Sequence, residues 1–395
     1  MNAQRPTWVE ISLPALVSNF AALQRRAACD GEFPAQLIAV VKCDAYGHGA
    51  APCATALSEA GAQWFAVTSP EEGAALRVAA VRQRILLLSG FYRDQAELVV
   101  ARRLTPSVWE LEQLDHLSRA VTAAGFRGAF PVHVEVDTGM SRQGVPLHQL
   151  RSFIDALASK RNLQLEGIYH HYAESEVVDS VHGNAQASAF TKSLTHLLEA
   201  GMRPRYFHQM NSAGLVSLSS SYLAPLFRSA DWRPQQLCRT GIALYGYCLR
   251  LEGSSHAFTP LPVAPILAWK SRIISLREVP AGTRVGYSGT FTTSRTTRIA
   301  SIPVGYGDGL GRRLSNRARM LVRGGFAPTV GNISMDMTLL DVTDAPAASL
   351  GDEVVILGAQ GALQIDAWDH ADLSGTIPYE VLCNISKRVP REYIL

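Results

Sequence analysis

Residues 37–50 read LIAVVKCDAYGHGA, a short apolar run that ends in a lysine and continues into a loop punctuated by glycine. The run Leu37–Lys42 has the length and composition of a buried strand. Partial desolvation at such a strand end frees the lone pair of an amine for Schiff-base chemistry, so Lys42 is a candidate nucleophile. Taken alone, a surface lysine at a loop start is the commoner explanation. The small residues Gly47 and Gly49 favour the functional interpretation, because they let the backbone approach a ligand.

The same strand-then-helix pattern recurs through the first two-thirds of the chain. Helical spacing of apolar residues is found over Glu71–Val81, Leu147–Ala158 and Ala187–Ala200. The predicted strands are Leu37–Lys42, Trp64–Val67, Arg84–Ser89, Leu104–Val108, Pro131–Val136, Leu165–His170, Arg205–Met210 and Leu237–Ile242. Eight strands, each followed by helix-like sequence, predict an α/β fold of the (β/α)8 TIM-type barrel class.

The pattern changes after Gly246. From Ala264 onward, β-rich segments with glycine and proline between them predict a second, C-terminal all-β domain with antiparallel strands. The polar stretch within Tyr247–Thr259 predicts the boundary. We therefore expect a barrel over residues 12–246 and a β domain over residues 247–395, with residues 1–11 pairing with the latter.

Composition excludes several classes of partner. A net charge of +3 on 395 residues indicates neither nucleic acid nor an anionic membrane. The N-terminus lacks the pattern of a signal peptide, and no apolar run reaches the length of a membrane span. The six cysteines form no CxxC pair, which favours free thiols in a reducing cytoplasm over disulfides or a metal site.

Basic and hydroxyl groups gather at the predicted strand ends. Barrel enzymes place their chemistry at the carboxyl ends of the strands. Lys42, Arg142, His170–His171, Asn211–Ser212 and Arg239 follow or end five of them. Few carboxylates accompany these groups, so we expect an anionic ligand such as a phosphate ester or a carboxylate.

Motifs along nearly the whole chain, from Ile11 to Tyr393, resemble those of the alanine racemase family in the same order. That family uses pyridoxal 5′-phosphate (PLP), and AVVKCDAYGHGA is similar to its PLP-attachment motif. The other similar motifs are VDTGMSRQGV, GIYHHYAESE, MNSAG, CRTGIALYG, VGYSGTF, IPVGYGDGLGRRLSN, VGNISMDM and GTIPYEVLCNISKRVPR. The resemblance implies an isomerase that converts L-alanine to D-alanine.

The resemblance also implies the catalytic pair. Lys42 would carry PLP as a Schiff base and act as one acid/base group, and Tyr287 would be the other, on the opposite face of the substrate. Two groups on opposite faces invert the centre, since a proton leaves one face and returns to the other. In the family the tyrosine reaches the partner subunit's barrel, so a homodimer with shared active sites is implied.

Further roles follow from the same resemblance. Arg239 would contact the pyridine nitrogen and His171 would lie by the ring and support Arg239. Arg142 would contact the phenolic oxygen and the substrate carboxylate, which the Met335 backbone would also bind. The remaining cofactor-binding residues, mostly at the phosphate, would be Tyr46, Asn211, Ser212, Gly241, Ile242 and Tyr379.

The sequence departs from the family pattern at a few positions. Glu135 stands where many members have a carbamylated lysine that orients the arginine, and we hypothesise that its carboxylate takes over part of that role. An ordinary polar residue of the barrel interior is the alternative. Among the residues implied to line the entrance (Glu176, Tyr306, Arg312 and Asn332), Asn332 replaces an arginine and Glu176 an aspartate. Cys43 stands where alanine is usual.

Three other functions remain open from sequence alone. A racemase of broader or different specificity, for serine, lysine, arginine or a biosynthetic amino acid, is the nearest. A non-racemising PLP-binding protein would lack the β domain, and with it Tyr287. A barrel decarboxylase would place a glutamate, rather than Arg239, at the pyridine nitrogen.

Overall fold

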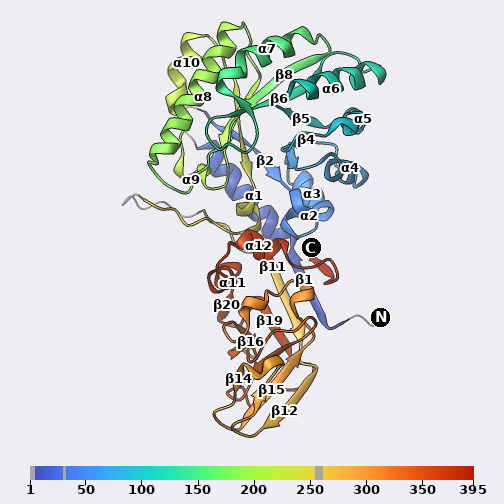
Figure 1. Ribbon diagram of the computed structural model, residues 1–395, viewed down its shortest axis with the longest axis vertical. Helices are drawn as coiled ribbons and strands as arrows, with labels where there is room; N and C mark the ends of the chain where they lie inside the picture. Colours follow the sequence, from blue (N-terminus) through green and yellow to red (C-terminus); the bar gives the residue numbers. More distant parts are fainter. Residues whose placement is uncertain (1–4, 30–32, 254–260) are drawn as a thin grey trace. The chain divides into compact units, whose positions relative to one another are not determined.

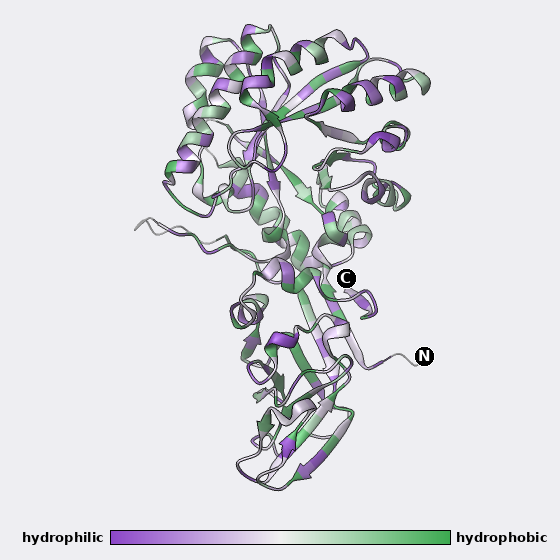
Figure 2. Ribbon diagram, in the orientation of Figure 1, coloured by the Kyte–Doolittle hydropathy of each residue, from purple (hydrophilic) through white to green (hydrophobic). Residues whose placement is uncertain are grey.

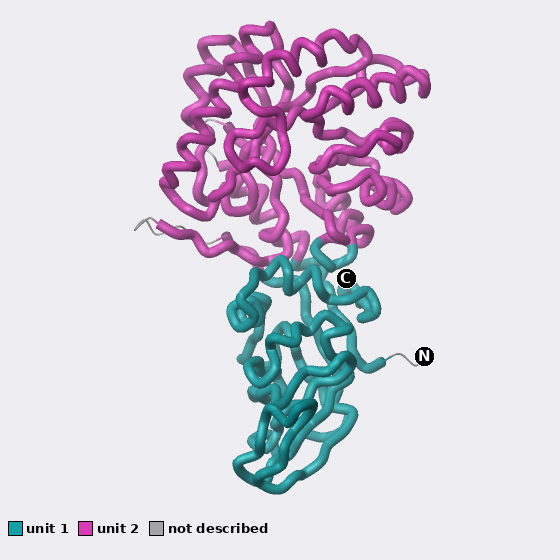
Figure 3. The backbone as a smooth tube through the Cα atoms, in the orientation of Figure 1, with its two compact units in different colours: residues 1–15, 46–49, 265–395 teal, residues 16–45, 50–264 magenta. Residues whose placement is uncertain are grey.

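The computed structural model describes residues 5–29, 33–253 and 261–395. Figure 3 shows its two compact units. The barrel unit comprises Leu16–Ala45 and Ala50–Ala264. The β unit comprises Met1–Ala15, Tyr46–Gly49 and Pro265–Leu395. The boundary stretch predicted within Tyr247–Thr259 lies outside the described residues from 254 onward.

The barrel unit contains a closed ring of eight parallel strands (Figure 1). The strands are β2 (Ala35–Val40), β3 (Trp64–Val67), β4 (Arg84–Leu87), β5 (Thr105–Val108), β6 (Phe130–Asp137), β8 (Leu163–Tyr169), β9 (Tyr206–Met210) and β10 (Gln235–Thr240). The ring closes because β10 pairs with β2 and β5 pairs with β6. The predicted barrel class is confirmed. The end of the first predicted strand is wrong, however, because Lys42 begins a helical turn rather than ending the strand.

Amphipathic helices accompany the barrel strands, and Figure 2 shows polar and apolar residues alternating around them. Helix α7 buries Leu150, Phe153, Ile154 and Leu157, at the spacing that places them on one face. The helices are α1 (Leu13–Ala28), α2 (Lys42–Tyr46), α3 (Ala50–Glu59), α4 (Pro70–Val78), α5 (Ala96–Ala101), α6 (Leu111–Ala123), α7 (Leu150–Ser159), α8 (Val181–Glu199), α9 (Gly214–Ser217) and α10 (Ala224–Ser229). Short 3-10 turns add η1 (Arg93–Gln95), η2 (Leu147–Gln149), η3 (Ser221–Leu223) and η4 (Ile242–Tyr245).

The β unit is built mainly of antiparallel strands, as predicted for the C-terminal region. Its largest sheet has the order β17-β16-β19-β11-β1-β21, with β20 beside β19. The N-terminal strand β1 (Thr7–Ser12) pairs antiparallel with β11 (Leu267–Arg272) and parallel with β21 (Arg391–Ile394). The other strands of this sheet are β16 (Arg319–Val322), β17 (Gly325–Pro328), β19 (Glu353–Gln360) and β20 (Leu363–Ile365).

Two smaller sheets and two helices complete the β unit. One sheet joins β12 (Ser275–Val279), β15 (Thr297–Ile302) and β18 (Thr338–Asp341), and the other joins β13 (Arg284–Val285) and β14 (Phe291–Thr292). The helices are α11 (Ala367–Ser374) and α12 (Pro378–Cys383), and 3-10 turns lie at η5 (Tyr287–Gly289), η6 (Tyr306–Asp308) and η7 (Arg312–Leu314). Among the described helices of both units, none combines the length and the apolar character needed to cross a membrane.

Polar side chains are buried inside the barrel ring. The middle of β6 alternates apolar residues with His133 and Glu135, and both polar residues are at most 3% exposed. On β9, His208 is fully buried, and on β10 Arg239 is 4% exposed. Buried polar groups require partners, so these residues direct attention to the barrel interior and its carboxyl end.

Candidate active site

A cavity of about 230 Å³ lies at the carboxyl ends of the barrel strands. Its lining includes a lysine, two arginines, a histidine and one carboxylate. The lining residues are Lys42, Thr68, Leu88, Ser89, Glu135, Arg142, Gln143, Tyr169, His171 and Arg239. The structure therefore brings together the predicted groups Lys42, Arg142, His171 and Arg239. Three cations beside a single carboxylate favour an anionic ligand.

Lys42 begins an unusual left-handed turn. The next four residues, Cys43 to Tyr46, have φ angles of 53° to 54°, and none of them is glycine. Such a conformation costs about 1 kcal/mol or more per residue unless contacts hold it. The carboxylate of Glu72 provides one such contact, because it accepts a hydrogen bond from the backbone N–H of Cys43 at 2.7 Å. It also accepts from the N–H of Thr68 at 2.7 Å, which fixes the carboxylate to the end of β3. Helix α4 thus holds the backbone on which Lys42 lies.

Arg239 is a buried cation held from several sides. Its guanidinium donates to the Nδ1 of His208 at 2.7 Å, to the Nδ1 of His171 at 3.0 Å and to the carbonyl of His170 at 2.9 Å. It also lies over the ring of Tyr169, 4.9 Å from the centroid. Burial lowers the pKa of Arg239, but a guanidinium stays charged in proteins. Arg239 therefore presents a fixed donor.

A directional chain of polar groups extends from Arg239 through the barrel interior. Because a guanidinium only donates, the Nδ1 of His208 accepts, and its Nε2 then donates to the Nδ1 of His133 at 2.9 Å. The Nε2–H of His133 then faces the Oε2 of Glu166 at 3.6 Å, and Glu166 is paired with Arg84. Burial lowers the pKa of both histidines, so both imidazoles are neutral at pH 7.

Glu166 carries the negative charge at the far end of this chain. Burial acts to raise its pKa, yet its contacts with His133 and Arg84 hold that pKa below its usual range. The carboxylate therefore stays ionised and fixes the tautomers of both histidines. Sequence reasoning missed His133, His208, Glu166 and Arg84. The available signal was the alternation of polar and apolar residues in PVHVEV, where interior positions of a barrel strand carry polar groups.

Glu135 binds neighbours other than Arg142. Its Oε2 accepts hydrogen bonds from the hydroxyl of Tyr169 and the amide of Gln143, both at 2.6 Å. Burial raises the pKa of Glu135, and these two hydrogen bonds oppose the rise. Arg142 also lines the cavity and is exposed. Any effect of Glu135 on Arg142 is therefore electrostatic rather than a direct hydrogen bond.

The two adjacent histidines face different surroundings. His171 lines the cavity and accepts from Arg239. His170 instead bonds to Thr138 at 2.8 Å and stacks on Phe190 with ring centroids 4.4 Å apart. Burial lowers the pKa of His170 to about 3. Of the pair, His171 is the one that lies in the cavity.

The residues predicted to bind phosphate fall into two groups, one in each unit. In the barrel unit, the hydroxyl of Ser212 accepts from the backbone N–H of Gly241 at 3.0 Å, just before the 3-10 turn that starts at Ile242. The side chain of Asn211 makes hydrogen bonds within the protein, because it donates to Ser175 and accepts from the N–H of Gly214. In the β unit, the rings of Tyr46 and Tyr379 lie with centroids 5.8 Å apart.

Several large side chains of the β unit are exposed, and four of them lie on neighbouring segments. Tyr287 is 73% exposed, Tyr306 43%, Met335 54% and Met337 48%. Hydrogen bonds connect the segments that carry them: the amide of Asn332 donates to the carbonyl of Tyr287 at 2.9 Å, and the N–H of Tyr306 donates to the carbonyl of Ser334 at 3.0 Å. These side chains belong to one local surface of the β unit.

The other predicted entrance residues are exposed or half-buried. Arg312 is exposed in η7 of the β unit, and Asn332 is half-buried there. Glu176 is half-buried in the barrel unit, where its carbonyl accepts from the N–H of Glu252 at 2.9 Å. Cys43, beside Lys42, is an exposed free thiol.

The donor set of the cavity fits PLP. PLP requires an amine for its aldehyde, a donor for its ring nitrogen and a polar turn for its phosphate. Lys42 and Arg239 of the cavity fit the first two, and the turn at Ser212, next to the backbone N–H of Gly241, fits the third. An eight-stranded parallel barrel with this lysine and arginine at its carboxyl end defines a barrel enzyme of the PLP-dependent class.

The chain belongs to the alanine racemase family, whose enzymes are PLP-dependent isomerases. The model of the alanine racemase N-terminal domain matches residues 11–248, and that of the alanine racemase C-terminal domain matches residues 266–393. The alanine racemase of Halothermothrix orenii is 38% identical over 389 residues, with 98% of this chain and 97% of the relative covered. That of Syntrophobacter fumaroxidans is 38% identical over 381 residues, with 96% of each covered.

Solved structures give the same family. The alanine racemase of Bacillus anthracis with bound L-Ala-P superposes with a TM-score of 0.85 at 30% identity, covering 100% of this chain and 96% of that one. The alanine racemase of Bartonella henselae with covalently bound pyridoxal phosphate gives 0.82 at 29% identity, covering 98% and 99%. These relatives support alanine racemisation over the other specificities and functions that the sequence left open.

Proposed function

We propose that Lys42 and Tyr287 are the two acid/base groups of this PLP-dependent racemisation of L-alanine to D-alanine. The observation that carries the proposal is the placement of Lys42 with Arg239 in one cationic cavity. When bound, PLP withdraws electrons from the amino-acid Cα and so makes its proton removable. Lys42 then exchanges a proton at one face of Cα, and the hydroxyl of Tyr287 exchanges one at the other face.

The other predicted residues bind and orient the ligands. With PLP bound, Arg239 would donate to the ring nitrogen without giving up its proton, which would limit the reaction to proton transfer at Cα. Arg142 and the backbone of Met335 would bind the substrate carboxylate, Arg142 would also contact the phenolic oxygen of PLP, and His171 would lie by its ring. The remaining cofactor contacts are assigned to Tyr46, Asn211, Ser212, Gly241, Ile242 and Tyr379. Glu176, Tyr306, Arg312 and Asn332 line the entrance.

The enzyme works as a homodimer whose active sites are shared between subunits. The exposed surface around Tyr287, Tyr306 and Met335 supports this assembly, because large apolar side chains at one site are typical of interfaces. We assign residues 12–246 to the PLP-binding barrel and residues 247–395 to the β domain, which residues 1–11 join. A cytoplasmic location accords with the six cysteines, which form no disulfide in the described structure.

The cofactor assignment is tested with Lys42→Ala and chiral analysis of the products. The purified enzyme should show the absorbance of a PLP Schiff base and convert L-alanine to a mixture of both enantiomers. Lys42→Ala should lose both signals. The exposed Lys192→Ala is the control and should keep both. Retention of the absorbance band by Lys42→Ala contradicts the assignment.

The shared site is tested by mixing two inactive variants. Lys42→Ala and Tyr287→Phe homodimers each lack one acid/base group at both sites. After denaturation and joint refolding, a mixed dimer has one site with both groups if the pair is contributed by different subunits. Activity should then return to about a quarter of wild type, since half the dimers are mixed and each has one intact site. No recovery, with a wild-type sample refolding normally, rules out sharing.

A further inference from the structure

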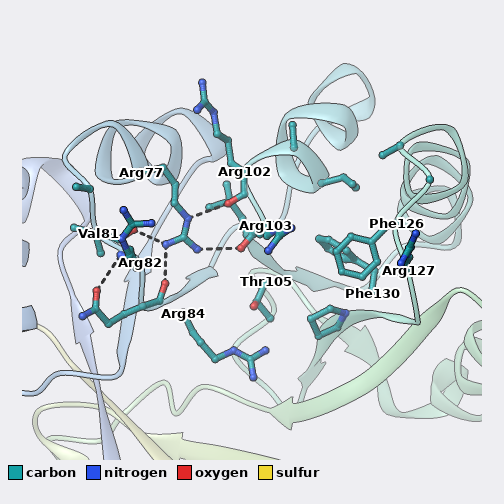
Figure 4. Close-up of a pocket in the computed structure, with 18 residues that line it drawn as sticks. Arg77, Val81, Arg82, Arg84, Arg102, Arg103, Thr105, Phe126, Arg127 and Phe130 are labelled. Atoms are coloured by element: carbon teal, nitrogen blue, oxygen red, sulfur yellow. Dashed lines mark hydrogen bonds between the residues drawn. The ribbon is translucent and has the colours of Figure 1, made fainter.

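A large cavity lies at the opposite end of the barrel from Lys42. Its volume is about 1110 Å³, above the ~300–1,000 Å³ that small-molecule sites usually have. Its lining residues come from three segments, 77–84, 100–105 and 124–131, which lead into the amino ends of β4, β5 and β6 (Figure 4). Barrel enzymes carry out catalysis at the carboxyl end, so the reaction makes no use of this site.

The cavity is strongly cationic. Six arginines line it: Arg77, Arg82, Arg84, Arg102, Arg103 and Arg127. None of the described residues that line it is acidic. Arg84 is neutralised by Glu166, but the other carboxylate–arginine pairs of the described structure lie elsewhere. Clustered like charges repel one another, so an arrangement of this kind is stabilised by a bound anion.

Arg77 holds the frame of the cavity rigidly. Its guanidinium donates to the carbonyls of Val81 and Gln83, both at 2.7 Å, and to those of Arg102 and Arg103 at 2.9 and 3.0 Å. Figure 4 shows these hydrogen bonds from Arg77 to the segment of Val81 and Gln83 and to that of Arg102 and Arg103. One half-buried side chain thereby fixes two backbone segments whose own arginines, Arg82, Arg102 and Arg103, are exposed.

Two phenylalanine side chains line the cavity together with these arginines. Phe126 is half-buried and packs edge-to-face on Phe130, with ring centroids 5.1 Å apart. Arg127 follows directly and is exposed. Guanidinium groups match phosphate oxygens in geometry as well as charge, and an exposed aromatic face accepts a flat ring.

We propose that this cavity binds polyphosphate, either an inorganic phosphate chain or that of a nucleotide. Arg82, Arg103 and Arg127 provide the charges, on a frame fixed by Arg77. The volume accommodates several phosphate groups, and the half-buried ring of Phe126 offers a surface on which a nucleotide base can stack. The site is separate from the racemase reaction and does not depend on the roles assigned to Lys42 or Tyr287.

The test is calorimetric titration of the PLP-loaded enzyme with tripolyphosphate and with ATP at low ionic strength, with Arg103→Asn/Arg127→Ser as the variant. Asparagine suits position 103, whose φ is 49°. Wild type should bind at least one of the two ligands with a Kd below 1 mM, and the variant should bind about tenfold or more weakly. If ATP binds more tightly than tripolyphosphate, the ligand is a nucleotide. If the two bind equally, the phosphate chain alone is sufficient for binding.

The matched control is Arg161→Ser/Arg203→Ser. These exposed arginines precede β8 and β9 on the same face of the barrel but lie outside the cavity, so the control loses the same charge. It should bind within twofold of wild type, and both variants should keep racemase activity. Equal weakening in the control, or no binding of either ligand by wild type up to several millimolar, overturns the proposal.

Discussion

The guanidinium of Arg239 lies 2.7 Å from the Nδ1 of His208, and this contact is the first of a series that ends at Glu166. Each group in the series has one possible role, because the arginine only donates and the carboxylate only accepts. The series keeps the side chain of Arg239 aimed at the cavity with its charge intact. Glu166 is thus a positioning residue for Arg239.

The first prediction is that Glu166→Gln lowers the turnover rate of the enzyme, although residue 166 does not line the cavity. Glutamine retains the shape but loses the charge that fixes the tautomer of His133. Loss of this charge next to His133 should lower kcat about tenfold, a change of about 1.4 kcal/mol, with KM for alanine little changed. The absorbance maximum of the bound cofactor should also shift. Glu97→Gln, an exposed carboxylate on α5, is the control and should behave as wild type. Unchanged kcat and spectrum in Glu166→Gln rule out the positioning role.

The second prediction concerns the left-handed turn after Lys42. Glu72→Ala removes the acceptor of the N–H groups of Cys43 and Thr68, so the turn should relax. We expect the Kd for PLP to rise about tenfold, a change of about 1.4 kcal/mol, as measured by fluorescence titration of the apoenzyme. Glu71→Ala is the matched control, since this neighbouring carboxylate on α4 is exposed and bonds instead to the side chain of Gln95. Equal affinity in both variants contradicts the role of Glu72.

The barrel was predictable from sequence because apolar runs mark its strands. Trp64–Val67 was predicted with both ends correct, since all four residues are buried and polar residues flank them. The motif residues Lys42 and Arg239 were found because they interrupt or end such runs. The left-handed turn was not predictable, because Glu72 holds it from 29 positions away in the chain. The contacts of Glu166 likewise depend on which strands adjoin in the closed ring.

The third prediction is a pH dependence of stability centred on Asp308 in the β unit. Its buried carboxylate accepts from the guanidinium groups of Arg5 at 3.0 Å and of Arg388 at 2.7 Å, and from the N–H of Gly305. Burial acts to raise its pKa, but these hydrogen bonds hold that pKa below its ordinary value. A lowered folded-state pKa stabilises the protein above the unfolded value of about 3.9, and that stability is lost as pH falls through the folded pKa.

Asp308→Asn should therefore destabilise the β unit by about 2 kcal/mol at pH 7, less than for a fully buried pair because both arginines are partly exposed. In urea unfolding at several pH values, the difference from wild type should persist to pH 5 and shrink below about pH 4. Asp344→Asn breaks an exposed pair with Arg295 and should cost under about 1 kcal/mol throughout. A difference for Asp308→Asn that stays constant with pH contradicts the ionic origin.

The fourth prediction decides what the carboxylate of Glu135 does in the cavity. Two donors, the hydroxyl of Tyr169 and the amide of Gln143, converge on its Oε2. Burial raises the pKa of Glu135, and the nearby charges of Arg239 and Arg142 oppose that rise. Glu135→Gln keeps an acceptor but removes the charge, so kcat/KM for alanine should fall about tenfold. Glu135→Lys places a third cation beside two arginines and should lower kcat/KM further. Wild-type rates in both variants would show that neither the charge of Glu135 nor its two hydrogen bonds influence Arg142 during catalysis. Glu135 would then be an ordinary polar residue of the barrel interior.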